Sequence, residues 1–212
     1  MLIGLTGKYC AGKNHAADIL EKRGLPVLDV DKLGHAALEH KKEEVFARFG
    51  QDLKNPDGSV NRRLLGEKVF RKKDEITALE AIVHPQTDRM TLEWISSQNG
   101  KTCVINAALL HRLAVFGRFD CIFLVDAPFL VRLFRAKRRD RLPWVSIFRR
   151  LMSQKRFTLQ YLAGNADIYI VENPWTGGFL PGSAGKKTKM ERRIGDILSK
   201  LELENRKIQG GF

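Results

Sequence analysis

The residues whose types and spacing most clearly indicate a binding site form a short loop near the start of the chain. Gly7 and Gly12, followed by Lys13, have the spacing of a loop that binds nucleotide phosphates. Glycines let the backbone curl so that its N–H groups point at phosphate oxygens, and a lysine in this place reaches the β- and γ-phosphates. The sequence therefore predicts a nucleotide site formed by Gly7, Lys8, Tyr9, Cys10, Ala11, Gly12, Lys13, Asn14 and His15.

Asn14 departs from the usual loop pattern, which has a serine or threonine hydroxyl on Mg²⁺ at this position. The side-chain carbonyl of asparagine is also a hard oxygen donor, so we expect Asn14 to ligate magnesium. Asp29 is a second candidate and would reach the ion through water. An equally simple interpretation is that Asp29 only satisfies backbone N–H groups.

Three segments must position this loop. Residues 2–6 form a short apolar run typical of a buried strand, and residues 14–22 are alanine-rich with apolar residues at helical spacing. A second apolar run, residues 27–31, ends in Asp29 and Asp31. This order predicts a strand–helix–strand unit with the loop at the end of its first strand.

Three further strands are predicted at residues 102–105, 121–125 and 167–171. Strands that alternate with helices indicate an α/β fold with a doubly wound, five-stranded parallel sheet. Ligands of such sheets bind beyond the carboxyl ends of the strands. Glycine and polar residues are expected at those ends: Gly7, Asp29, Asp31, Asn106, Asp126 and Asn173.

The long stretch between the second and third strands predicts an additional helical part. Its helices are expected at residues 32–49, after Asn61 as the capping residue, at 74–84 ending before Pro85, and at 86–97. We therefore expect an inserted substrate domain at 31–99 and a basic lid at 131–159. The nucleotide-binding core would comprise 1–30, 100–130 and 160–212, including a Gly/Pro-rich loop at 175–185 and a final amphipathic helix at 190–203.

The chain carries 37 Lys and Arg against 24 Asp and Glu, a formal net charge of +13, which predicts a polyanionic partner. Nucleic acid is one such partner, and a nucleotide with a second phosphorylated substrate is another. Basic residues gather between Arg132 and Arg156, with only Asp140 opposing them, and a second cluster between Lys186 and Arg193 is interpreted as a solvated surface.

The remaining composition indicates a globular protein of the cytoplasm. The most apolar region, residues 121–134, is interrupted by Asp126, Pro128 and Arg132, so neither a membrane span nor a membrane partner is expected. The three cysteines lack metal-ligand spacing, and Cys103 and Cys121 lie in strand-like runs that predict buried thiols in a reducing compartment.

An ordered set of motifs resembles the dephospho-coenzyme A kinase family. The resemblance begins with the loop and the D-x-D segment at Asp29 and Asp31, and it extends nearly to the end of the chain. Further matching segments, in the family's order, are Phe49-Gly50, Asp57-Gly58, Asn61-Arg62-Arg63-Leu64, Val69-Phe70, Leu79-Glu80, His84-Pro85, Leu109-Leu110, Arg135, Arg139-Asp140, Gln154, Ala166-Asp167 and Asn173.

The sequence departs from the family pattern at three places. Besides Asn14, Lys8 and Tyr9 stand where the family has a glycine and a small aliphatic residue, which places extra charge and bulk beside the phosphates. Ala108 and Arg112 replace the proline and glutamate of the family's P-L-L-x-E segment.

The resemblance implies transfer of the γ-phosphoryl group of ATP, with Mg²⁺, to the ribose 3′-hydroxyl of dephospho-CoA. Asp31 is the candidate base, although a helix N-cap at this position is the alternative. Lys13 and Arg139 would stabilise the transferred group, Arg135 and Asn173 would contact ATP, and the expected substrate contacts are Asp31, His35, Arg62, His84 and Leu109.

Two alternatives remain at this level. The first is a kinase of another nucleoside or nucleotide on the same fold. The second is a catalytically weakened scaffold that binds nucleic acid or a protein, although no nucleic-acid recognition motif of the usual kinds is present, so no specific nucleic acid is expected. The oligomeric state stays open.

Overall fold

The computed structural model describes residues 1–70, 72–154, 157, 161, 166–174 and 188–209, with side chains as far as Glu204. The expectations for the stretch 175–185, for Lys186 and Lys187 and for lid residues 155–156 and 158–159 lie outside the described residues. The chain forms two compact units. Unit 1 comprises Met1–Val27, Thr102–Arg112 and Phe116–Phe212, and unit 2 comprises Leu28–Lys101 and Leu113–Val115.

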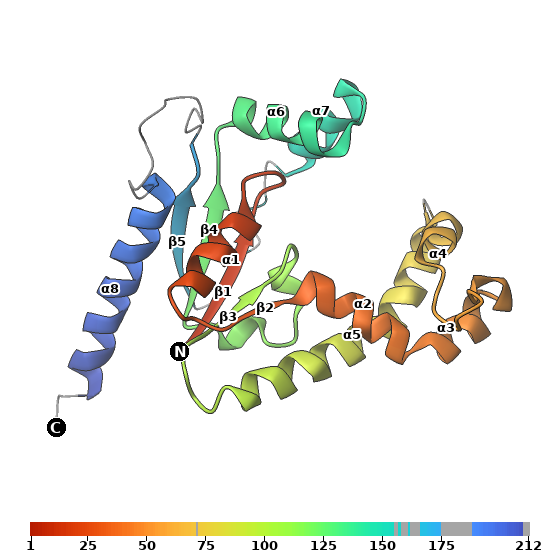
Figure 1. Cartoon of the computed structure of the whole chain (residues 1–212), viewed down its shortest axis with the longest axis horizontal. Coiled ribbons are helices and arrows are strands. Elements are labelled where there is room, and N and C mark those ends of the chain that lie inside the picture. Colours follow the sequence, from red (N-terminus) through yellow and green to blue (C-terminus); the bar gives the residue numbers. More distant parts are fainter. Residues whose placement is uncertain (71, 155–156, 158–160, 162–165, 175–187, 210–212) are drawn as a thin grey trace. The chain divides into compact units, whose positions relative to one another are not determined.

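A five-stranded sheet forms the centre of unit 1 (Figure 1). Its strands are β1 (Leu2–Gly7), β2 (Val27–Asp29), β3 (Cys103–Asn106), β4 (Cys121–Asp126) and β5 (Asp167–Glu172), in the order β2-β3-β1-β4-β5. The pairings of β1 with β3, β1 with β4 and β4 with β5 are parallel. The predicted α/β fold with a five-stranded parallel sheet is confirmed, and the boundary between the units falls within β2.

The register aligns the carboxyl ends of the strands. Gly7 at the end of β1 is opposite Val125, and Asp126 at the end of β4 is opposite Glu172. Asn173 follows β5, and its backbone N–H donates to the Asp126 carbonyl at 2.7 Å. Gly7, Asp126 and Asn173 therefore lie at one edge of the sheet, as predicted.

The helices of unit 1 are α1 (Lys13–Lys22), α6 (Phe129–Asp140), α7 (Trp144–Ser153) and α8 (Lys189–Gln209), with short 3₁₀ turns at Leu110–Arg112 and Phe116–Arg118. Apolar side chains of α1 and α8 pack with those of β1, β4 and β5 in one buried cluster, which excludes water from this face of the sheet. As predicted, α8 contributes Ile194, Ile197, Leu198 and Leu201 to that cluster.

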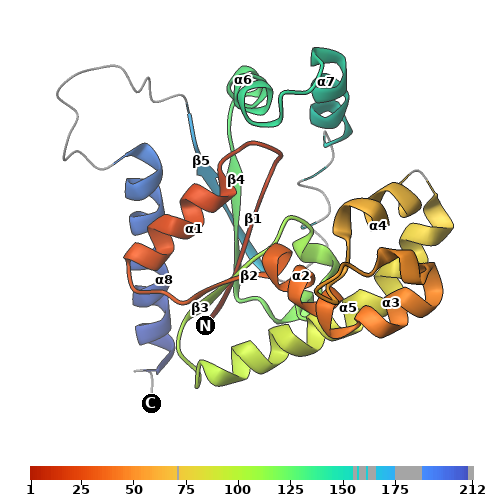
Figure 2. The same ribbon diagram turned by 45° about the vertical axis from the view of Figure 1, so that its right-hand side comes forward.

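Unit 2 is helical (Figure 2). It contains α2 (Val30–His40), α3 (Lys42–Phe49), a 3₁₀ turn (Gln51–Leu53), α4 (Arg62–Val69) and α5 (Lys73–Ser97). Its own apolar cluster is formed by Leu38, Val45, Phe46, Leu53, Val60, Leu65 and Val69.

No helix among the described residues is long and apolar enough to cross a membrane.

Two predictions for unit 2 were wrong. The helix expected at 32–49 is interrupted at Lys41, which has φ −103° and ψ 16°, so that α2 and α3 are separate helices. The interruption allows Leu38 of α2 and Phe46 of α3 to enter the same apolar cluster.

The second error concerns Pro85, which was expected to end a helix but lies inside the continuous helix α5. Proline removes one backbone hydrogen bond, to the carbonyl four residues earlier. That carbonyl belongs to Ala81, an exposed residue that water can reach. The Thr87 hydroxyl donates to the Val83 carbonyl at 3.0 Å, which satisfies another acceptor in this turn.

Candidate functional site

The loop between β1 and α1 is a tight turn held by its own backbone. The Ala11 N–H donates to the Lys8 carbonyl at 2.9 Å, and Cys10 and Gly12 adopt left-handed φ values of 58° and 102°. Gly12 is the N-cap of α1 and makes no side-chain cap. The N–H groups of the first turn of α1 and the positive end of the helix dipole therefore favour an anion here.

Glycine is required at both ends of this turn for steric reasons. A Cβ on Gly7 would lie 2.9 Å from the Val125 carbonyl oxygen, because β1 and β4 pair closely there. A Cβ on Gly12 would lie 2.2 Å from the Asn173 amide nitrogen. The loop is thus a cradle of backbone groups that leaves no space for side chains at these points, as a phosphate site requires.

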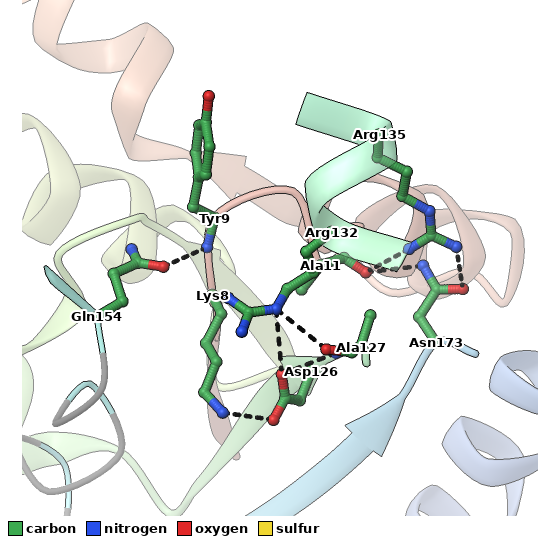
Figure 3. A network of polar contacts seen from close by, with 9 residues as sticks. All are labelled: Lys8, Tyr9, Ala11, Asp126, Ala127, Arg132, Arg135, Gln154 and Asn173. Carbon is green, nitrogen blue, oxygen red and sulfur yellow. Dashed lines mark hydrogen bonds and ion pairs between the residues drawn. The ribbon is translucent and has the colours of Figure 1, made fainter. Parts of the chain in front are cut away.

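Arg135 and Asn173 fix the middle of the loop (Figure 3). The Ala11 carbonyl accepts from Asn173 Nδ2 at 2.7 Å and from an Arg135 guanidinium nitrogen at 3.2 Å. Arg135 also donates to Asn173 Oδ1 at 3.3 Å. The structure therefore brings both predicted ATP-contacting residues to the loop, where together they orient its backbone.

Lys8 extends from the loop to the end of β4 (Figure 3). Its ammonium lies 2.5 Å from Asp126 Oδ2, and Arg132 Nε lies 3.9 Å from Asp126 Oδ1. Arg132 is buried and donates to the Ala127 carbonyl at 3.0 Å. Asp126 therefore offsets the extra charge that Lys8 introduces, and the Lys8 side chain is directed at this carboxylate.

Tyr9 links the loop to the helix pair α6–α7. Its backbone N–H donates to Gln154 Oε1 at 2.6 Å, as Figure 3 shows, and its hydroxyl donates to the Asp140 carboxylate. Arg139 lies above the Tyr9 ring, with its guanidinium carbon 5.1 Å from the ring centroid. Arg139 Nε also donates to Asp140 Oδ1 at 2.7 Å.

These contacts shift the ionisation of the groups beside the loop. The hydrogen bond from Arg139 lowers the pKa of Asp140 below its ordinary value, and the Tyr9 hydroxyl adds to this effect. Burial raises the pKa of the Tyr9 hydroxyl, and the hydrogen bond to Asp140 raises it further. Burial also raises the pKa of the Cys10 thiol, which therefore carries little thiolate at neutral pH.

A pocket of about 300 Å³ opens beside the loop in unit 1. Gly12 and His15 line it from the loop side, and Arg135 and Asn173 line it from α6 and the end of β5. Thr188 and Met190, at the start of α8, complete it. The pocket is continuous with the predicted phosphate site and offers polar and apolar surface to the rest of a nucleotide.

The other predicted site residues are divided between the units. Lys13, Asn14, Arg139 and the exposed Leu109 belong to unit 1. Those of unit 2 are Asp29, Asp31, His35, Arg62 and His84, of which all but Asp29 are exposed.

The structure corrects two expectations for Asp29 and Asp31. Asp31 does not end a strand, because β2 stops at Asp29 and Asp31 lies in the first turn of α2. Asp29, and not Asp31, is the N-cap of α2: its Oδ1 accepts from the Lys32 N–H at 3.2 Å. A capping carboxylate satisfies a free N–H at the helix start, so Asp29 does accept a backbone hydrogen bond, and its contact with magnesium through water stays a prediction.

A sequence-family model described as dephospho-CoA kinase matches residues 1–173. The chain belongs to the dephospho-CoA kinase family. The matched range includes the whole of the phosphate loop and the whole of unit 2.

Individual relatives agree with this family. A dephospho-CoA kinase of Treponema denticola is 32% identical over 191 residues, which cover 85% of each chain. One of Treponema pallidum is 28% identical over 209 residues, covering 94% of each chain. A crystal structure of a Thermus thermophilus protein has a TM-score of 0.73 at 30% identity, over 95% of this chain and 97% of that one.

Four residues that contact the loop or its neighbours were not assigned to the site from the sequence. They are Asp126, Arg132, Asp140 and Gln154, and all but Arg132, which donates to Ala127, contact a partner far away along the chain. A signal existed for Asp126, which follows an apolar strand, and for Asp140, the one carboxylate in the basic run. Neither signal identifies the partner, since pairing depends on tertiary structure.

Proposed function

We propose that this protein transfers the γ-phosphoryl group of ATP to the ribose 3′-hydroxyl of dephospho-CoA, giving coenzyme A and ADP. This reaction is the final step of coenzyme A synthesis. The family match over residues 1–173 carries the proposal, because it includes both the phosphate loop and the helical unit with Asp31. It favours this kinase over a non-catalytic scaffold.

The phosphate end of ATP is assigned to the loop. Lys13 and the N–H groups at the start of α1 hold the β- and γ-phosphates, while Arg135 and Asn173 keep the loop in shape through the Ala11 carbonyl. Arg139 neutralises charge on the transferred group, because a planar guanidinium matches phosphate oxygens. The adjoining pocket, which His15 and Met190 line, receives the nucleoside.

A magnesium ion that ATP carries needs few protein ligands, and the residues present fit this requirement. Among the described residues, no group of three or more His, Cys, Asp or Glu side chains could hold a metal. Mg²⁺ usually keeps several waters and binds substrate phosphates with few protein ligands. Asn14, exposed in the first turn of α1, would supply one oxygen, and Asp29 would act through water.

Asp31 is the proposed base. It accepts the proton of the 3′-hydroxyl as the new oxygen–phosphorus bond forms and the bond to the β,γ-bridging oxygen breaks, which releases ADP. His35 lies four residues later on α2 and therefore on the same helix face. We assign His35, Arg62, His84 and Leu109 to dephospho-CoA, with Arg62 on its phosphates.

The Asp31→Asn variant tests this role. We expect kcat to fall by roughly 10²–10⁴-fold, because a positioned base contributes about that factor, while ATP binding is retained. Asp74→Asn is a matched control, since Asp74 is likewise an exposed acid in the first turn of a helix of unit 2. Unchanged turnover in Asp31→Asn would refute the assignment.

A panel of acceptors separates this reaction from that of a kinase for another nucleoside or nucleotide. Efficient turnover is expected only with dephospho-CoA.

The three cysteines are free thiols, which fits a reducing compartment, and we propose a cytoplasmic location.

A further inference from the structure

Tyr9 belongs to the phosphate loop in sequence and to the helix pair α6–α7 in its packing. Its ring contacts a small apolar cluster whose buried members are Ala136 of α6 and Ile147 and Leu151 of α7. Cys10 contacts the same cluster. The loop therefore contributes two consecutive side chains to the interior of the helix pair.

The backbone N–H, the hydroxyl and the ring of Tyr9 each make one further contact. Its N–H is bound by Gln154 after α7, its hydroxyl donates to Asp140 at the end of α6, and its ring lies under Arg139. The hydrogen bond to Asp140 is charge-assisted and hence stronger than one between neutral groups. These contacts approach Tyr9 from both helices, so they resist separation of either helix from the loop.

Arg139 depends on this arrangement for its position. Its side chain is 62% exposed, and a long exposed arginine normally samples many rotamers. Here its guanidinium donates twice to Asp140, at 2.7 and 3.3 Å, and lies over the Tyr9 ring. Asp140 is in turn held by the Tyr9 hydroxyl, so a residue of the phosphate loop determines where the cation lies.

We propose that Tyr9 is a positioning residue that holds α6–α7 on the phosphate loop and thereby places Arg139 for phosphoryl transfer. The first part concerns the fold of unit 1 alone. The second part rests on the proposed kinase function. The two parts are tested by different measurements, so that the failure of one is distinguishable from the failure of the other.

Thiol labelling without substrate tests the first part. Cys10 is half-buried beside Tyr9, whereas Cys103 and Cys121 are buried in strands and serve as internal references. The Tyr9→Phe variant keeps the ring and removes only the hydroxyl. We expect the labelling rate of Cys10 to rise several-fold in Tyr9→Phe while those of Cys103 and Cys121 stay unchanged.

Tyr169→Phe is the matched control, because Tyr169 is also half-buried in unit 1 with a cation, Lys200 Nζ, 5.5 Å from its ring centroid. No change in Cys10 labelling is expected in this variant. Equal Cys10 rates in wild type and Tyr9→Phe would overturn the first part of the proposal.

Steady-state kinetics with a double-mutant cycle tests the second part. Tyr9→Phe should lower kcat roughly tenfold with little change in the KM for ATP, because a displaced Arg139 loses a charge-assisted hydrogen bond to the transferred group in the transition state. In an Arg139→Ala background the same substitution should change kcat less than twofold, because its effect passes through Arg139. An equal loss in both backgrounds would show a merely structural role and overturn the positioning of Arg139.

Should the wild-type enzyme not turn over dephospho-CoA at all, the proposed function fails together with the second part. The Cys10 labelling would then still decide whether Tyr9 holds the helix pair on the loop.

Discussion

Lys8 of the phosphate loop forms an ion pair with Asp126 at the end of β4. Lys8 lies 2.5 Å from the carboxylate of Asp126, and its side chain is 21% exposed. The Lys8 N–H donates to the Val125 carbonyl at 3.1 Å, so both its backbone and its side chain are tied to the end of β4. A lysine is thus accommodated beside the phosphate site because its charge is offset at the neighbouring strand.

Asp140 should make the free energy of unfolding depend on pH. Its folded pKa is lowered, chiefly by the hydrogen bond from Arg139, so the unfolded chain binds its proton at a higher pH than the folded one. The stabilisation is therefore complete above the ordinary aspartate pKa of about 3.9 and is lost as the pH falls through the lower folded value.

Urea unfolding of wild type and Asp140→Asn at several pH values checks this prediction. We expect a constant difference in unfolding free energy between about pH 7 and pH 5, which then shrinks below about pH 4. A difference that does not change over the whole pH range would contradict the pairing of Asp140 with Arg139.

The backbone of the site was predictable from the sequence, but most of its side-chain partners were not. Gly7, Gly12 and Lys13 identify the loop because spacing along the chain is enough to specify a local turn. The contacts of Tyr9 with Asp140 and Gln154 join residues more than 130 positions apart, and local sequence carries no information on them.

Among the secondary-structure elements, the strands follow the sequence most closely. Each of the five begins and ends within two residues of its expected position, since these strands are short apolar runs bounded by glycine or polar residues. The helices of unit 2 depend more on packing. The break at Lys41 brings Leu38 and Phe46 into one apolar cluster. Helix α5 continues through Pro85 because the Ala81 carbonyl, which loses its helical N–H partner, belongs to an exposed residue that water can reach.

One capping interaction of unit 2 is directly testable. The Asn61 side chain accepts from the Leu64 N–H at 3.0 Å and was correctly predicted as the N-cap of α4. Asn61→Ala should destabilise α4 by about 1 kcal/mol, the usual loss for such a cap.

Amide hydrogen exchange resolves this effect by element. We expect exchange in α4 to accelerate roughly fivefold or more, the factor that corresponds to about 1 kcal/mol, while β1 and β4 in unit 1 keep their protection. The exposed Arg63→Ala in the same helix is a suitable control. Equal acceleration in both variants would contradict the specific contribution of the cap.

On the scale of the whole molecule, the candidate site residues are divided between two units with separate cores. Unit 1 provides the phosphate loop and the basic helices α6 and α7, and unit 2 carries the candidate base Asp31. The net charge of +13 suits a protein whose two substrates are both phosphorylated. The sequence predicted an inserted helical part from the length between two strands, because a simple crossover needs far fewer residues.

The proposed reaction is tested by incubating the purified protein with MgATP, with and without dephospho-CoA, and measuring ADP and the mass of the CoA product. We predict ADP formation that requires dephospho-CoA and is matched by an equal amount of product heavier by one phosphoryl group. That outcome would also show that asparagine at position 14 supports the reaction. Retained ATP binding without any phosphorylation of dephospho-CoA would refute the proposed function.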